Sequence, residues 1–170
     1  MQPRRHLAHA QGYLELGMVA EAAAELGRIP APDSEAPEVV AVRIAVLHEQ
    51  EDWPALQVVA AGFAGRAPDE AAAWVTWAYA ARRAESLSAA ERILLAAEHH
   101  HPIEPTIQFN LGCYACQRGD LIEARRRVDR AIALDANFSA AAATDPDLAP
   151  LRAATPSGSP GQQGAREQPL

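Results

Sequence analysis

Three consecutive histidines, His99, His100 and His101, stand directly before Pro102, and imidazole nitrogens are common ligands of zinc and other transition metals. Neighbouring side chains of a helix point about 100° apart, so three consecutive rings do not converge on one ion. The repeat register does not place an acidic residue or a cysteine near them as a further metal ligand. Histidines at the carboxyl end of a helix also complement the helix dipole, and we therefore expect no metal ion and no cofactor here.

Cys113 and Cys116 form a C-x-x-C motif, the spacing of many redox-active and zinc-binding cysteines. In redox proteins the motif follows a strand and begins a helix, whose dipole lowers the thiol pKa. Here both cysteines fall inside a predicted helix with no strand before it, which favours small side chains on a helix surface. A metal- or thiol-dependent protein that uses His99–His101 with these cysteines is the alternative from another functional class. We assign no catalytic residue and do not expect an enzyme.

The chain has 170 residues and a formal net charge of −7, and its 15 basic residues are all arginine. Without lysine, Schiff-base chemistry and a P-loop lysine are excluded. The negative charge disfavours a nucleic-acid backbone as partner. No run of about 18 apolar residues predicts a membrane span, and no basic segment before a long apolar run predicts a secretion signal. We expect a cytoplasmic protein that binds neither nucleic acid nor membrane.

The sequence repeats itself with a period of 34 residues, without insertion or deletion. Apolar or small residues recur in the same columns of four successive units, with polar residues between them. Such a period is typical of stacked helical hairpins, because each unit buries its apolar face only against its neighbours. Three of the columns contain Ala22, Leu56, Ala90 and Ala124; Leu26, Ala60, Leu94 and Val128; and Ala10, Ile44, Ala78 and Gly112.

Turn signals divide each unit into two helices. Gly119 supplies the left-handed residue that ends one helix, and Asp120 with Glu123 predicts a capping box at the start of the next. Prolines separate the units, because proline stops one helix and is tolerated in the first turn of another. The predicted helices cover residues 4–16, 19–29, 37–50, 53–65, 70–83, 87–99, 105–117 and 121–133.

Residues 3–136 resemble four tandem tetratricopeptide repeats (TPRs). The fourth unit, FNLGCYACQRGDLIEARRRVDRAIALD, contains the Leu-Gly pair, Tyr114, the Gly-Asp joint and the alanines of the second helix. The third unit matches from Trp74 to Pro102, whereas Ile44 and Leu56 replace small residues in the second. The resemblance implies an all-α fold, a right-handed superhelical solenoid of antiparallel helix pairs. It also implies a non-enzymatic protein-interaction module.

In TPR proteins the first helices of the repeats line a concave groove that usually holds an extended or helical segment of a partner protein. The resemblance implies that Tyr79 and Phe109 grip an apolar side chain, while Arg82 and Arg83 pair with a carboxylate of an acidic partner. A solvated surface with satisfied charges is the alternative for the two arginines. The candidate partner-binding residues are Arg4, Gln11, His48, Glu49, Val75, Tyr79, Arg82, Arg83, Phe109, Asn110 and Cys113.

The residues on the first helices also bear on other functions of TPR proteins. The lysines and asparagines of chaperone-binding TPR clamps are replaced mostly by apolar or uncharged residues, so recognition of a chaperone tail is disfavoured. A type III secretion chaperone is the nearest alternative, although such proteins generally have about three repeats and a dimerising amino-terminal segment. A structural role, in which the first repeat stacks against another copy, is a third. We expect a monomer or a weak dimer.

Residues 137–153 form one more amphipathic piece, broken at Pro146, and we expect them to cap the last repeat. Residues 154–170 are rich in Ser, Gly, Pro and Gln and are expected to be a disordered tail. The tryptophans, Trp53, Trp74 and Trp77, are expected in the core. Residues 125–130 include four arginines that we expect to form a solvated basic strip.

Overall fold

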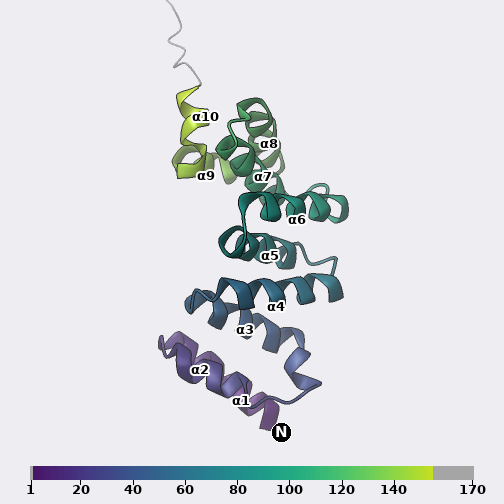
Figure 1. Ribbon diagram of the computed structural model, residues 1–170, viewed down its shortest axis with the longest axis vertical. Helices are drawn as coiled ribbons and strands as arrows, with labels where there is room; N and C mark the ends of the chain where they lie inside the picture. The colour runs from purple at the N-terminus through teal and green to yellow at the C-terminus, as the bar shows by residue number, and fades with distance from the viewer. Residues whose placement is uncertain (1, 155–170) are drawn as a thin grey trace, which may run out of the picture.

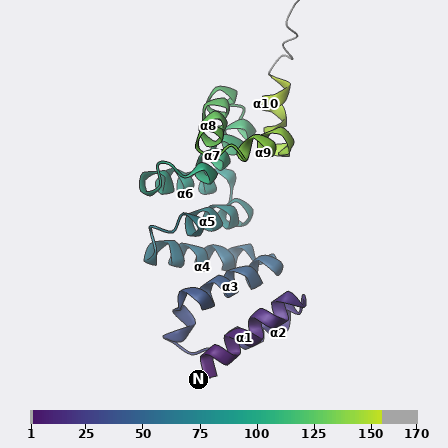
Figure 2. The ribbon, with the colours of Figure 1, turned by 180° about the vertical axis from the view of Figure 1, so that it is seen from behind.

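The computed structural model describes residues 2–154, which form helices and no strand. Figures 1 and 2 show helical hairpins stacked along the long axis of the molecule, from the amino end to the carboxyl end. The predicted all-α architecture of antiparallel helix pairs is confirmed. None of the helices in the described residues is long and apolar enough to span a bilayer. The hairpins are α1 (Gln2–Glu15) with α2 (Val19–Leu26), α3 (Pro37–Glu49) with α4 (Trp53–Arg66), α5 (Ala71–Ala84) with α6 (Leu87–His100), and α7 (Pro105–Gln117) with α8 (Leu121–Leu134); a short 3₁₀ helix, η1 (Asp33–Glu35), precedes α3.

The helix ends lie within about two residues of the predicted ones, except that α2 ends at Leu26 and not at residue 29. Gly27 is a poor helix former, and Pro30 disfavours helical geometry in the residue before it. The backbone N–H groups of Arg28 and Ile29 therefore bond to carbonyls three residues earlier and close a turn.

The joint inside three of the four hairpins has a recurring geometry, whereas Glu85, at the same place of the third hairpin, has a φ angle of −124°. Gly17 and Gly119 have φ angles of 72° and 83°, which glycine adopts without steric cost. Glu51 stands at the same place of the second unit with φ of 53°, although it carries a side chain. Asp52 and Asp120 then begin the next helices by accepting hydrogen bonds from backbone N–H groups three residues on.

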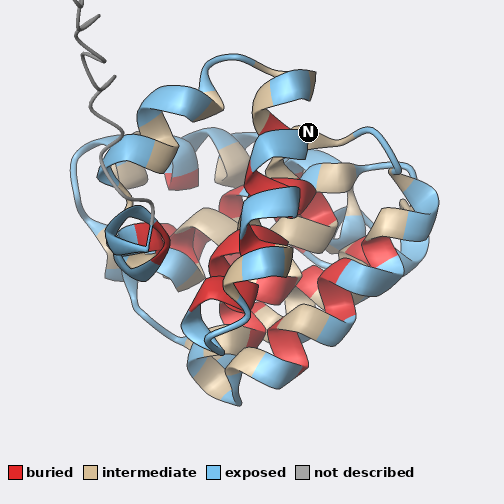
Figure 3. Cartoon of the chain, turned by 90° about the horizontal axis from the view of Figure 1, so that it is seen from above, coloured by how far each residue is buried: buried red, intermediate tan, exposed pale blue. Residues whose placement is uncertain are grey.

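Two clusters of buried apolar residues stabilise the stack. One joins α1, α2 and α3, and the other joins α5 with every element after it. Between them, α4 packs more extensively against α5 than against α3, its partner in the hairpin. The larger side chains Ile44 and Leu56 occupy positions that hold small residues in the other units. Figure 3 shows buried residues on the inner sides of the helices and exposed residues on the outer sides.

The expected solvated basic strip on α8 is partly wrong, because Arg127 is buried. Its guanidinium donates to Glu98 of α6, to the Gln108 side-chain oxygen of α7 and to Glu123 of its own helix. The carboxylate of Glu123 also accepts two hydrogen bonds from Arg126. The backbone N–H of Asp120 donates to the carbonyl of Ala115, so the Glu123 side chain does not complete the predicted capping box. This network connects three helices of the last two hairpins.

The network predicts a pH dependence of stability. Hydrogen bonds from Arg126 and Arg127 lower the pKa of Glu123 from 4.5 to about 2. Burial opposes ionisation of Glu98, but hydrogen bonds from Arg127 and Gln108 keep its pKa below the usual value. A carboxyl group whose pKa is lowered by folding stabilises the folded state fully at pH values above its unfolded-state pKa. This stabilisation is lost as the pH falls through the folded-state pKa. We expect the free energy of unfolding to decline as pH falls from about 4.5 toward 2.

Urea unfolding followed by circular dichroism at several pH values between 7 and 2 measures this decline. In Glu123→Gln the free energy of unfolding should be lower at pH 7 and should decline less on acidification. Asp129→Asn, a change at an exposed residue of the same helix, should leave the wild-type pH dependence in place. Equal acid sensitivity of the wild type and Glu123→Gln would contradict the assignment.

The carboxyl-terminal segment continues the repeat and then turns back. α9 (Phe138–Thr144) begins one residue before the place that the 34-residue period gives it. The chain reverses at η2 (Pro146–Leu148) and α10 (Ala149–Ala153), which both contact α7. Leu148 and Leu151 are buried in the second cluster. Residues 155–170, nearly all of the expected tail, lie outside the described residues.

Candidate functional site

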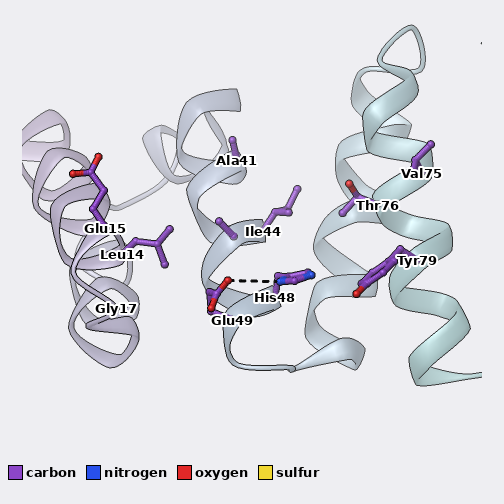
Figure 4. A pocket seen from close by; sticks show the side chains of 11 residues that line it. Leu14, Glu15, Gly17, Ala41, Ile44, His48, Glu49, Val75, Thr76 and Tyr79 are labelled. Carbon is purple, nitrogen blue, oxygen red and sulfur yellow. Dashed lines mark ion pairs between the residues drawn. The ribbon is translucent and has the colours of Figure 1, made fainter. Parts of the chain in front are cut away.

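A groove of 740 Å³ lies on one face of the stack, between the first helices of the first three hairpins. Leu14 comes from α1, Ile44 from α3 and Val75 from α5, and with Ala41 and Ala45 these residues make its surface largely apolar. Figure 4 shows that the side chains come from three separate helices. The groove spans helices of both buried clusters, because α1 and α3 belong to one cluster and α5 to the other.

A smaller hollow of 430 Å³ adjoins the groove and shares His48, Glu49 and Tyr79 with it. The ring centroids of His48 and Tyr79 are 5.6 Å apart in a stacked arrangement, and Trp53 meets Tyr79 edge-on at 5.7 Å. Such ring pairs stabilise one another beyond the area they bury. Trp53 is therefore half-buried in the wall of a surface hollow, which corrects the expected core position.

The two arginines that were expected to act together have separate surroundings. Arg82 donates to Asp147 of η2 at 2.8 Å, and its guanidinium carbon lies 5.3 Å from the centre of the Tyr114 ring. Arg83 turns toward the hollow and lies over Tyr79 at 3.6 Å. Asp147 is distant in sequence and already neutralises Arg82. The structure therefore does not bring the two guanidinium groups together as a clamp for one carboxylate.

Two of the three predicted binding residues of the fourth repeat, Phe109 and Cys113, are buried. Phe109 is buried and its ring centroid is 5.0 Å from that of Phe138 in α9. Cys113 is 3% exposed, and Asn110 donates its side-chain amide to the carbonyl of Thr106 in the same helix. Phe109 and Cys113 are therefore not offered to a partner in this structure, whereas Asn110 is half-buried. The segment α9–η2 covers the part of α7 that the repeat pattern placed in the groove.

The cysteine pair is not poised for thiol chemistry. Cys113 and Cys116 are buried inside α7. Burial, together with the carboxylates of Asp145 and Asp147, raises the pKa of the Cys113 thiol from 9.0 to about 12. The thiolate is the reactive and metal-binding form, so this environment suppresses both kinds of chemistry.

His100 and His101 contact different neighbours. His100 stacks on Trp74 with ring centroids 5.3 Å apart. The His101 Nε2 atom is 2.9 Å from the carbonyl oxygen of Pro68, which also accepts a hydrogen bond from the Trp74 indole. Within residues 2–154, no group of three His, Cys, Asp or Glu side chains is placed to hold a metal ion.

The groove therefore contains four of the eleven predicted binding residues, namely His48, Glu49, Val75 and Tyr79. Arg83 lines only the adjoining hollow, and Arg4 and Gln11 are exposed on α1 away from both. Sequence reasoning missed the following lining residues: Leu14, Ile44, Glu51, Trp53 and Thr76. Ile44 carries a usable signal, since it is the one large residue in a column of Ala10, Ala78 and Gly112.

The whole described stack can be compared with solved structures. It is similar to the crystal structure of TTC0263, a thermophilic TPR protein from Thermus thermophilus, with a TM-score of 0.64. The fold is that of a TPR solenoid. The similarity covers 89% of this chain and 81% of the other, at 16% sequence identity, so it concerns the fold alone. No protein-family model matches the sequence, and no curated protein matches it.

Proposed function

We propose that this protein is a non-enzymatic interaction module that binds a segment of a partner protein in the groove between α1, α3 and α5. The proposal rests on one observation, the open groove that three TPR hairpins form with apolar side chains from each first helix. Burying one large apolar side chain of a partner there contributes about 1.5–3 kcal/mol. TPR folds generally bind other proteins, which supports the same conclusion. We also propose that it acts in the cytoplasm.

The same proposal divides the chain by role. Residues 3–136 provide four repeats, residues 137–153 cap the last one, and residues 154–170 are a tail. The cap fills the concave side at α7, and the contact of Phe109 with Phe138 supports this role for its first helix. Partner binding is therefore assigned to the first three repeats.

Blocking the groove tests the function. In Ala45→Arg a long cationic side chain projects from the middle of α3 into the groove, whereas in Ala133→Arg the same side chain is added to an exposed position of α8. We expect affinity capture from native extract to recover proteins with the wild type and Ala133→Arg that Ala45→Arg loses. An unchanged helical content by circular dichroism would show that Ala45→Arg loses binding and not its fold. If every captured protein stays bound to Ala45→Arg, the groove is not the binding site.

A further inference from the structure

The charged residues that line the groove are acidic. Among the described residues, the groove is lined by two carboxylates, those of Glu15 in α1 and Glu49 in α3. The imidazole of His48 also lines it. The adjoining hollow adds Glu51. All three are exposed, and within residues 2–154 none of them forms an ion pair with an arginine. The carboxylate of Glu49 lies 3.9 Å from the Nδ1 atom of His48.

The positive charge near the groove is already engaged. Asp147 neutralises Arg82 from the cap, and this removes one of the two guanidinium groups on which an acidic partner would depend. Arg83 lines the hollow, and its guanidinium carbon lies 3.6 Å from the ring centre of Tyr79 and 5.0 Å from that of Trp53. The formal charge along the groove and the hollow, three carboxylates against one guanidinium, is therefore negative.

We propose that the partner segment is apolar and cationic, with an aliphatic or aromatic side chain seated between Leu14, Ile44 and Val75 and an arginine or lysine beside Glu15 or Glu49. This inference rests on the proposed function and specifies its partner. Complementary charges across a groove select the partner and fix its register. It reverses the expectation of an acidic partner, which assumed that both arginines were available.

The aromatic rings beside Glu49 favour the same chemistry. Tyr79 and Trp53 hold a guanidinium of this chain at cation–π distance, so their faces are suited to cationic groups. A cationic side chain of the partner in the hollow would be attracted by the carboxylates of Glu49 and Glu51 and repelled by the guanidinium of Arg83. Removing the Arg83 charge should therefore strengthen the binding of a cationic segment and weaken that of an acidic one.

Random twelve-residue peptides displayed on phage and selected on the full-length protein test this inference. Phage that also bind Ala45→Arg are removed, so that the selected peptides depend on the groove. We expect the remaining sequences to combine large apolar residues with Arg or Lys. The best peptide is then synthesised, and its dissociation constant is measured by fluorescence anisotropy.

Two charge-matched variants separate specific contacts from the net charge of −7. Glu15→Gln with Glu49→Gln should weaken the peptide about tenfold. Glu21→Gln with Asp129→Gln removes the same charge from exposed sites outside the groove and should change the affinity less than twofold. Arg83→Gln should increase the affinity, because it removes the guanidinium that a cationic peptide meets in the hollow.

The outcomes test the cationic partner separately from the proposed function of binding in the groove. Selected peptides that depend on the groove but are acidic, and that lose affinity in Arg83→Gln, would overturn the cationic partner and leave the binding function standing. Equal weakening by both pairs of Glu or Asp substitutions would also overturn it, because general charge attraction would then explain the binding. Failure to select any peptide that distinguishes the wild type from Ala45→Arg would contradict both proposals.

Discussion

Replacing Gly112 with valine will lower the free energy of unfolding by about 3 kcal/mol. Even the first carbon of a side chain at this position would lie 2.9 Å from a methyl carbon of Val128 and 3.3 Å from the carbonyl oxygen of Ala124. Both atoms belong to α8, so α7 and α8 approach each other so closely that any side chain at residue 112 would require the neighbouring atoms to shift. Valine adds two more carbons, and the helices must separate to admit them.

Urea unfolding of Gly112→Val measures the loss, and Gly12→Val is the matched control. Gly12 is also inside a helix, but a carbon added there has no neighbouring atom within 4 Å. We expect that control to change the free energy of unfolding by less than about 0.5 kcal/mol, since valine and glycine differ little in helix propensity. A similar loss in both variants would mean that helix propensity, and not the close approach to α8, explains the effect.

Replacing Leu148 with alanine will detach the carboxyl-terminal segment from α7. Leu148 is 1% exposed, and truncating a buried leucine typically lowers the free energy of unfolding by about 3 kcal/mol. Since η2 packs on α7, where Cys113 is buried, opening of the segment should expose that thiol. The rate at which an aromatic disulfide reagent labels the thiols should rise by about a hundredfold, as a change of about 3 kcal/mol implies.

Leu16→Ala is the control for this experiment, because Leu16, in the turn after α1, is 75% exposed and lies far from the carboxyl-terminal segment in the chain. It should leave the labelling rate within about twofold of the wild type, since truncating an exposed leucine removes little buried area. Labelling of Leu148→Ala at the wild-type rate would show that the segment does not protect Cys113. Full unfolding is distinguished from local opening by measuring the circular dichroism of the same sample.

Part of the candidate site was predictable because it depends on helical register. His48, Glu49, Val75 and Tyr79 lie on the first helices of successive units, and the 34-residue period places them on one face. The burial of Phe109 and Cys113 was not predictable in this way. The repeat pattern gives each first helix the same concave face, but it does not show that the next segment will fold back over the last one.

The sequence by itself determined the all-α solenoid, the hairpin joints and nearly all helix ends. These features depend on interactions between residues close in the chain or one period apart, such as the φ of Gly119 and the cap of Asp120. Only the tertiary structure decided which charges are free. Arg82 pairs with Asp147, 65 residues away, and Arg127 is buried between Glu98 and Gln108 on other helices. Such pairs do not follow the 34-residue period of the sequence, because they depend on how whole helices pack against each other.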